Sequence, residues 1–562
     1  MKLNSFSSIQ DRNSFLFSIL VFCFSFGFFL YRTYFGIDFF DEPYYSALTL
    51  RLLLGQKLFV DELYLAQTFS VLSYPFFKLH WQLNHSLEGV IIFMRWMVLG
   101  LYLTLGLFIY FSLKKFTDRS LALIAAASSC LYFPGNMLTL SYNSLGTLFL
   151  VLGLFGLFLA QKKESPGFFF LSGIFMALSS IAYITFCAIT ALLFLYILIL
   201  TPKKKLSLFF AAGVAGVMLY PALFIAQHFS DFLSSLAFGK EYLHGTPTLS
   251  HMFEVLHKFF PKTVLGFGML FAGIAHFTSK RSPIIFYWVL CLTPLMAVGL
   301  SILSYAMWSV YPFYLSLLSL ISFYKIKNSP LAVNLLKWIF IPSWITGLIA
   351  SGTSASGHIN AQVGMVPAAI IALVFLGEAL KECRIKFNIP ALVSVSLPVF
   401  LILFFPLNIW SDSEFKYLTE KIEVGPFRGI KTSKENKLVA ERMYRELKPI
   451  LNTEGPLLVY PNFSSVYLIS AIPPARGVTW YQHSGRTNKI LAGLYQKQIA
   501  PQALVVRMKV GHGAPFNKPT SFFDSKDPLN HLIESTHSPI KDTDWFTVFS
   551  PNVVPLSPIP KG

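Results

Sequence analysis

Three carboxylates, Asp38, Asp41 and Glu42, lie close together near the start of the chain, within residues 36–45. If this segment is helical, the i, i+3, i+4 spacing puts all three on one helix face. Such a face can bind a cation or accept a proton from a hydroxyl group. The alternative is structural, because an acidic residue before Pro43 commonly caps the start of a helix. On this segment alone, both interpretations stay open.

The elements that must position these carboxylates are those of a membrane protein. The chain has 562 residues, of which 54% are hydrophobic and only 13% are charged, against about 25% charged in a soluble domain. A helix needs about 17–25 mainly apolar residues to cross a bilayer. We therefore expect an α-helical polytopic membrane protein with about 13 transmembrane helices. The apolar segments are 14–31, 89–113, 119–135, 141–160, 168–184, 187–200, 206–228, 262–278, 283–303, 305–324, 331–350, 362–380 and 389–410.

The basic residues indicate the orientation of these helices. The formal net charge is +18, which in a soluble protein would suggest nucleic acid. Here much of it falls in short clusters at alternate gaps, which is typical of cytoplasmic loops. We expect no nucleic-acid partner, a cytoplasmic N-terminus and an external C-terminus. The clusters include Lys114-Lys115, Lys162-Lys163, Lys203-Lys204-Lys205, Lys280-Arg281, Lys325 with Lys327, and Lys381.

Two regions follow from this orientation. Residues 1–410 form a transmembrane domain whose first external loop, 32–88, carries interfacial helices, because its apolar stretches are too short to span. Residues 411–562 shift to a soluble composition and predict an external α/β domain that ends in a Pro-rich tail. Within it, residues 455–460 and 503–508 are predicted strands, and residues 434–451 and 462–470 are predicted helices.

The chain shows no Walker loop, HExxH motif or dinucleotide fingerprint. Inside the apolar segments the main charges are Arg95 and Glu378, whereas an ion-coupled transporter usually carries acidic groups at mid-membrane. External carboxylates favour chemistry at the outer face on a substrate that the membrane delivers. The alternatives are a transporter or flippase for lipid-linked sugars, and a non-catalytic scaffold for assembly of the cell envelope.

Four short segments resemble the GT-C glycosyltransferases that use polyprenyl-phosphate sugars, a group that includes aminoarabinose transferases, protein O-mannosyltransferases and RgtA/B/C/D-like proteins. Asp41-Glu42-Pro43-Tyr44-Tyr45 matches the acidic pair that follows the first helix in that family. The other segments are 141–148, 425–432 and 459–463. The resemblance implies an integral membrane enzyme, here of a bacterial inner membrane with a periplasmic C-terminus.

The resemblance also implies roles for residues. Asp41 is the expected general base and Glu42 a second carboxylate of an inverting transfer, in which a sugar moves from a polyprenyl-phosphate donor to a lipid, glycan or protein acceptor. The same pair would hold a divalent cation, Mg²⁺, Mn²⁺ or Zn²⁺. The leaving phosphate needs positive charge, for which the candidates are Arg51, Lys240, Arg428 and Lys431. The alternative for each is a surface charge or a contact with a lipid headgroup.

The second external loop differs from the family pattern in one respect. Many members carry another acidic residue in the second external loop, but residues 133–147 contain no Asp or Glu. An Asn side chain can coordinate or donate a hydrogen bond but cannot act as a base, so the departure counts against a metal site and leaves the base role to Asp41. The residues expected to line the substrate are Tyr44, Tyr142, Asn143, His244, His358 and Asn360.

Overall fold

In a computed structural model of the chain, the segments pack into two compact units. Unit 1 comprises Met1–Thr33, Arg95–Leu223 and Pro247–Asn408, and unit 2 comprises Tyr34–Met94, Phe224–Thr246 and Ile409–Gly562. The structure describes residues 9–131, 138–201, 203–242, 254, 257–303, 307–354, 357–383, 412–452, 455–461, 463–479, 491–493, 495–496, 503–509 and 527–552.

Unit 1 is a bundle of apolar helices. In the described part of the chain, seven helices are long and apolar enough to cross a membrane, and three more are apolar but shorter. Each predicted apolar segment from 14–31 to 362–380 is helical over most of its described residues, whereas 389–410 lies outside the described residues. The chain is thus an α-helical membrane protein. The helices of the bundle are α1 (Ile9–Arg32), α4 (Val90–Leu113), α5 (Arg119–Leu131), α6 (Tyr142–Lys163), α7 (Pro166–Ala182), α8 (Phe186–Leu200), α9 (Lys205–Gln227), α12 (Lys262–Arg281), α13 (Pro283–Leu303), α14 (Met307–Ile326), α15 (Pro330–Leu335), η3 (Leu336–Phe340), α16 (Ile341–Gly352), η4 (Gly357–Asn360) and α17 (Ala361–Glu382).

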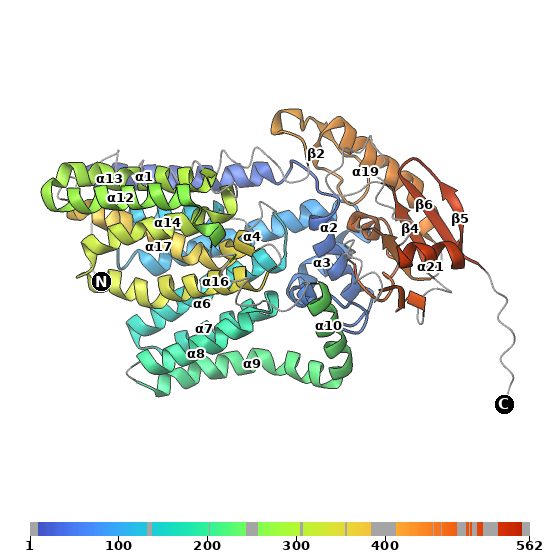
Figure 1. Ribbon diagram of the computed structural model, residues 1–562, viewed down its shortest axis with the longest axis horizontal. Helices are drawn as coiled ribbons and strands as arrows, with labels where there is room; N and C mark the ends of the chain where they lie inside the picture. Colours follow the sequence, from blue (N-terminus) through green and yellow to red (C-terminus); the bar gives the residue numbers. More distant parts are fainter. Residues whose placement is uncertain are drawn as a thin grey trace. The chain divides into compact units, whose positions relative to one another are not determined.

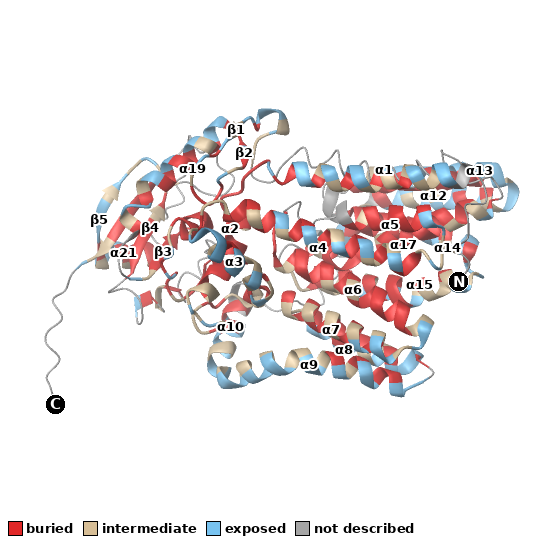
Figure 2. Ribbon diagram, turned by 180° about the vertical axis from the view of Figure 1, so that it is seen from behind, coloured by how far each residue is buried: buried red, intermediate tan, exposed pale blue. Residues whose placement is uncertain are grey.

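The bundle is built around α6 and α17, which are mostly buried, while α9 is mostly exposed (Figure 2). Small residues allow the closest helix contacts. A Cβ atom added to Gly173 on α7 would lie 2.2 Å from the carbonyl oxygen of Phe210 on α9, and one added to Gly213 would lie 2.1 Å from that of Phe170. Such contacts are typical of membrane helices, whose association depends on close packing because lipid supplies no hydrophobic driving force.

Unit 2 combines short helices with two small sheets. The predicted strands at 455–460 and 503–508 and the predicted helix from residue 434 are confirmed. The helices are α2 (Asp41–Leu53), η1 (Leu65–Phe69), α3 (Ser70–Asn84), α10 (Phe229–Tyr242), η6 (Phe415–Tyr417), α19 (Lys434–Leu447), η7 (Ile450–Asn452), η8 (Ser464–Leu468) and α21 (Pro528–Thr536). The strands are β1 (Glu420–Lys421), β2 (Lys431–Thr432), β3 (Leu457–Tyr460), β4 (Leu504–Met508), β5 (His537–Asp542) and β6 (Phe546–Pro551).

The larger sheet has the strand order β3-β4-β6-β5, in which β3 and β4 are parallel and the other neighbours are antiparallel. Strands β4, β6 and β5 are labelled in Figure 1. All four residues of β3 are buried, as expected for a strand covered on both faces. The apolar core around it includes Val505 of β4 and Phe549 of β6, together with Leu63 from the first loop and Phe238 from α10. The C-terminal segment therefore shares one core with parts of the chain that precede residue 411.

Candidate functional site

Asp38 caps the helix that carries the other two carboxylates. Its carboxylate accepts backbone N–H hydrogen bonds from Phe40 at 3.0 Å, Asp41 at 2.8 Å and Glu42 at 3.1 Å. These are the donors that the first turn of a helix leaves without intrahelical partners. The three carboxylates do not share a helix face, because α2 begins at Asp41 and Asp38 precedes it. The capping role thus belongs to Asp38.

The pKa of Asp38 gives a testable pH dependence. Burial, followed by the nearby charge of Asp41, raises this pKa from 3.8 to about 7. Between these values the folded protein holds a proton that the unfolded chain has lost, so the Asp38 contribution to stability falls as pH rises from about 4 to about 7. The expected size is about 1.4 kcal/mol for each pKa unit.

We expect Asp38→Asn, whose side-chain oxygen can still cap α2, to remove this contribution. The difference in thermal stability between wild type and variant, measured from pH 4 to pH 8, should therefore change across the window and level off above it. A difference that is constant with pH would contradict the assignment.

Asp41 is the most accessible of the three acidic side chains. It is partly exposed at the first position of α2, whereas Asp38 and Glu42 are each only 4% exposed. Tyr44, one of the expected substrate-lining residues, is buried, and its ring packs edge-to-face on Tyr64 with centroids 6.0 Å apart. A proton acceptor must be reached by its substrate, and of the three carboxylates Asp41 meets this condition best.

The segment before α2 is attached to the C-terminal part of unit 2. Asp412 accepts hydrogen bonds from the Ile37 N–H at 2.8 Å and the Thr432 hydroxyl at 2.6 Å. Lys431 exchanges backbone hydrogen bonds with the same segment, accepting from Gly36 at 2.8 Å. The ring of Phe39 stacks on Phe463 at 5.3 Å. These contacts fix residues 34–40, and with them the start of α2.

Removing the Asp412 carboxylate tests this attachment. Asp412 also accepts from the Asn436 side chain at 2.8 Å and from the Ser413 N–H at 2.7 Å, so Asp412→Ala leaves four hydrogen-bond donors without this acceptor. Since a hydrogen bond to a charged group contributes about 1.5–3 kcal/mol, we expect a loss of about 2 kcal/mol or more. Thermal unfolding measures it, with the exposed Asp544→Ala as control. Equal stability of the two variants would show that the attachment does not depend on Asp412.

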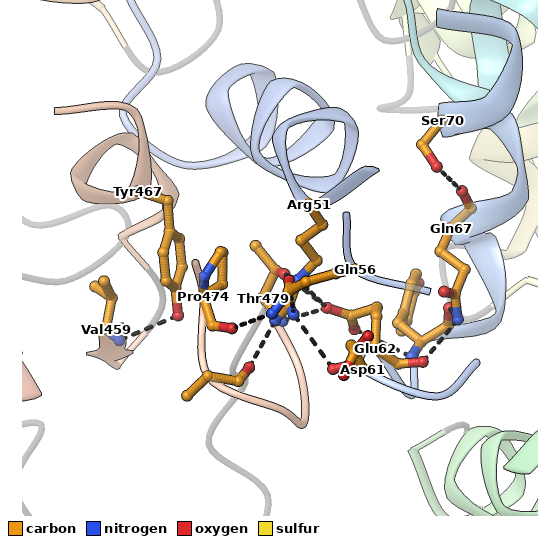
Figure 3. A network of polar contacts seen from close by, with 12 residues as sticks. Arg51, Gln56, Asp61, Glu62, Gln67, Ser70, Val459, Tyr467, Pro474 and Thr479 are labelled. Atoms are coloured by element: carbon orange, nitrogen blue, oxygen red, sulfur yellow. Dashed lines mark hydrogen bonds and ion pairs between the residues drawn. The ribbon is translucent and has the colours of Figure 1, made fainter. Parts of the chain in front are cut away.

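Arg51 lies at the centre of a buried polar network (Figure 3). Its Nε atom lies 3.2 Å from a carboxylate oxygen of Glu62 and donates to the Thr479 hydroxyl at 2.8 Å. Its other nitrogens donate to the Gln56 side chain at 2.8 Å and the Ala475 carbonyl at 2.9 Å. Arg51 and Glu62 are 3% and 2% exposed. The network joins the first loop to residues 474–479, so Arg51 is engaged within unit 2; its expected role at a phosphate stays a prediction.

Two of the other expected phosphate ligands lie on the surface of unit 2. Arg428 is largely exposed and forms an ion pair with Glu88 at 3.1 Å. Lys431 is exposed, with its Nζ 5.6 Å from the centre of the Phe35 ring. Lys240 belongs to α10 but its side chain is not among those described, and His244 lies outside the described residues.

The remaining expected residues belong to unit 1. Tyr142 and Asn360 lie together there, because each contacts Tyr183: the Tyr142 ring is 5.5 Å from the Tyr183 ring, and the Asn360 amide donates to its hydroxyl at 3.5 Å. Asn143 is buried in the first turn of α6. His358 belongs to η4, but its side chain is not described. Sequence analysis missed Tyr183, which follows α7 with no spacing pattern to single it out.

The expected divalent cation has few ligands here. Among the described residues, no three His, Cys, Asp or Glu side chains are close enough together to hold a metal ion. Asp38 already accepts three backbone hydrogen bonds, which leaves Asp41 and Glu42 as a pair. Two carboxylates do not make up the six oxygen ligands that Mg²⁺ prefers, so the described side chains alone do not fit such a site.

No protein-family model and no curated protein matches this chain. Among solved structures, it is similar to the oligosaccharyltransferase of Archaeoglobus fulgidus in complex with Zn and sulfate, with a TM-score of 0.48 and 12% identity over 87% of this chain and 68% of that one. A second match is the oligosaccharyltransferase AglB of the same organism, in complex with an inhibitory peptide and a dolichol-phosphate, with a TM-score of 0.47 and 12% identity over 88% of this chain and 69% of that one. At these scores the matches carry no argument about substrate or mechanism.

Proposed function

We propose that this chain is an inverting membrane glycosyltransferase that moves a sugar from a polyprenyl-phosphate donor to a hydroxyl group of a lipid, glycan or protein acceptor. The proposal rests on the different structural roles of the three carboxylates. Asp38 caps α2 with three backbone hydrogen bonds, so the partly exposed Asp41 is not needed as a cap. The resemblance of residues 41–45 to the acidic pair of the GT-C family supports the same role.

In this mechanism Asp41 removes the proton from the acceptor hydroxyl. The acceptor oxygen then attacks the sugar carbon from the side opposite the lipid phosphate. The bond from that carbon to the phosphate oxygen breaks, and polyprenyl phosphate leaves with the electron pair. A fixed base is more effective than a mobile one, and the contacts of residues 34–40 with Asp412 and Lys431 hold the start of α2 in place.

The leaving phosphate gains negative charge and needs nearby cations. Arg428 and Lys431 fit this role best among the described candidates, because both are exposed and both lie in the segment that contacts the chain just before α2. Arg51 is buried with Glu62 and is better suited to positioning. A divalent cation at Asp41 and Glu42 would need ligands beyond this pair; it stays a prediction, and no step of the mechanism depends on it.

We place the reaction at the extracytoplasmic face of a bacterial inner membrane. The Lys-rich gaps at alternate positions support a cytoplasmic N-terminus and an external acidic segment. In unit 1, Tyr142, Asn143, Tyr183 and Asn360 would line part of the path of donor or acceptor. The contact of Tyr183 with both Tyr142 and Asn360 supports grouping them.

The test is a transfer assay with the purified full chain, a panel of polyprenyl-phosphate sugars and candidate hydroxyl acceptors. Mass spectrometry would follow free polyprenyl phosphate and the glycosylated product together. Formation of both from one donor supports the enzyme. Movement of the intact donor across a vesicle membrane, without release of phosphate from any donor, would instead identify a flippase and overturn the proposal.

A further inference from the structure

The bundle of unit 1 contains a long apolar groove between α12, α13 and α14. Its volume is about 450 Å³, which is within the range of about 300–1,000 Å³ for ligand pockets. Its lining extends along α12 from Val264 to Ser279, which at about 1.5 Å per residue is about 22 Å. This matches one bilayer leaflet, whose hydrocarbon half is about 15 Å thick and is followed by the headgroup region. The groove thus has the length and apolar character of a lipid chain site.

One end of the groove is basic. Lys280 and Arg281 form the last turn of α12, and Lys325 and Lys327 lie at the end of α14. We call these four residues the basic rim. The Nζ of Lys327 lies 4.5 Å from the centre of the ring of Tyr324, which lines the groove.

Two further contacts place the helix ends together at the rim. Lys325 lies 6.0 Å from the centre of the Phe286 ring in the first turn of α13. The His276 ring on α12 lies 6.5 Å from the ring of Tyr324. Lys325 and Lys327 therefore lie over two rings that line the groove, at the same end as the last turn of α12, where Arg281 lies over the ring of Phe277. On α17, Glu378 pairs with Lys381 at 3.0 Å, and Glu382 and Lys325 both act electrostatically on Cys383.

We propose that this groove binds one anionic phospholipid, with an acyl chain along α12 and the phosphate at the basic rim. Apolar walls alone would accept any lipid tail, but the rim selects for negative charge, because each Lys or Arg near a membrane surface contributes about 1 kcal/mol toward anionic lipid. This site is separate from the proposed transfer chemistry, since it involves neither the carboxylates of α2 nor the cations of unit 2. Its role would be to hold α12 against α13 and α14.

Two glycines of α12 provide a matched pair of variants. Gly268 lines the groove and Gly266 does not, and a Cβ atom added to either would have no heavy atom within 4 Å. Gly268→Leu should therefore fill the groove without a backbone clash, and Gly266→Leu is the control. The charge of the rim is tested with the double variant Lys325→Gln/Lys327→Gln. Its control is Lys114→Gln/Lys115→Gln, a basic pair that follows the end of α4. In this pair Lys114 also lies over an aromatic ring, that of Phe111.

The experiment is native mass spectrometry of the purified full chain, titrated with phosphatidylglycerol or phosphatidylcholine. Wild type and both controls should bind one phosphatidylglycerol more tightly than phosphatidylcholine. Gly268→Leu should lose at least tenfold in affinity for both lipids. Lys325→Gln/Lys327→Gln should lower the affinity for phosphatidylglycerol by about fivefold for each lysine and leave the affinity for phosphatidylcholine unchanged. Unchanged binding by Gly268→Leu, no preference for the anionic lipid, or a polyprenyl phosphate as the lipid retained on purification would each overturn the proposal.

Discussion

Replacing Asp41 by Asn is expected to reduce sugar transfer by about 10²–10⁴-fold, which is the contribution of a positioned general base. Asn has nearly the same shape and can donate or accept a hydrogen bond, but it cannot take the proton of the acceptor hydroxyl. Because the backbone N–H of Asp41 bonds to Asp38, α2 should keep its cap in the variant. The rate of product formation at saturating donor, with thermal stability measured in parallel, separates lost chemistry from lost folding.

Asp118 offers a matched control. It also lies at the start of a helix, where its carboxylate accepts the Ser120 N–H at 2.8 Å at the beginning of α5. Asp118→Asn should leave both transfer and stability nearly unchanged, since Asn caps helices as well as Asp. If Asp41→Asn retains full activity as well, Asp41 is not the base; Asp38 and Glu42 are then the next carboxylates to replace.

Cutting the buried ion pair in unit 2 should produce the largest loss of stability. Arg51→Ala leaves the buried charge of Glu62 without its partner, so we expect the free energy of unfolding to fall by about 3–5 kcal/mol. The pKa of Glu62 is already raised, because burial outweighs the opposing effect of Arg51 and of the hydrogen bonds from Thr479 and Tyr64. Part of the loss should therefore be recovered in Arg51→Met/Glu62→Gln, which leaves no charge behind. The unfolding temperature and the rate of proteolysis of unit 2 are the measurements.

The exposed pair Lys203–Glu164 is the control for this prediction. Its side chains are 63% and 60% exposed, and such pairs contribute about 0–1 kcal/mol. Lys203→Ala should therefore shift the unfolding temperature very little. A similarly small shift for Arg51→Ala would mean that the network in Figure 3 does not stabilise the first loop.

Local patterns in the sequence predict the helices of the bundle well. The apolar segment predicted at 283–303 is α13 (Pro283–Leu303), and the one predicted at 89–113 is α4 (Val90–Leu113). Such segments are long, and Pro283 and the basic residues at their ends mark the boundaries. The strand β3 was also predictable, because a short apolar run after Gly455-Pro456 is typical of a buried strand.

Long-range contacts account for what could not be predicted. Asp38, Asp41 and Glu42 all satisfy the pattern of a helix cap, and only the point where α2 begins decides among them. Arg51 resembles an available cation in the sequence, but its partner Thr479 is more than 400 residues away and gives no local signal. Strand β5 contains Pro539 and is mostly exposed, so it lacks the alternation that identifies a strand.

The contacts that fix the acidic segment also set an order of events during synthesis. Ile37 cannot form its hydrogen bond until Asp412 has been synthesised, 375 residues later, and Arg51 cannot bond to Thr479 until 428 residues later. At about 5–20 residues per second, the interval is roughly 20–90 s. A nascent chain therefore exposes Asp41 well before its supporting partners exist. A truncated product would carry the carboxylates without the contacts that align them, so under the proposed function it should not transfer sugar.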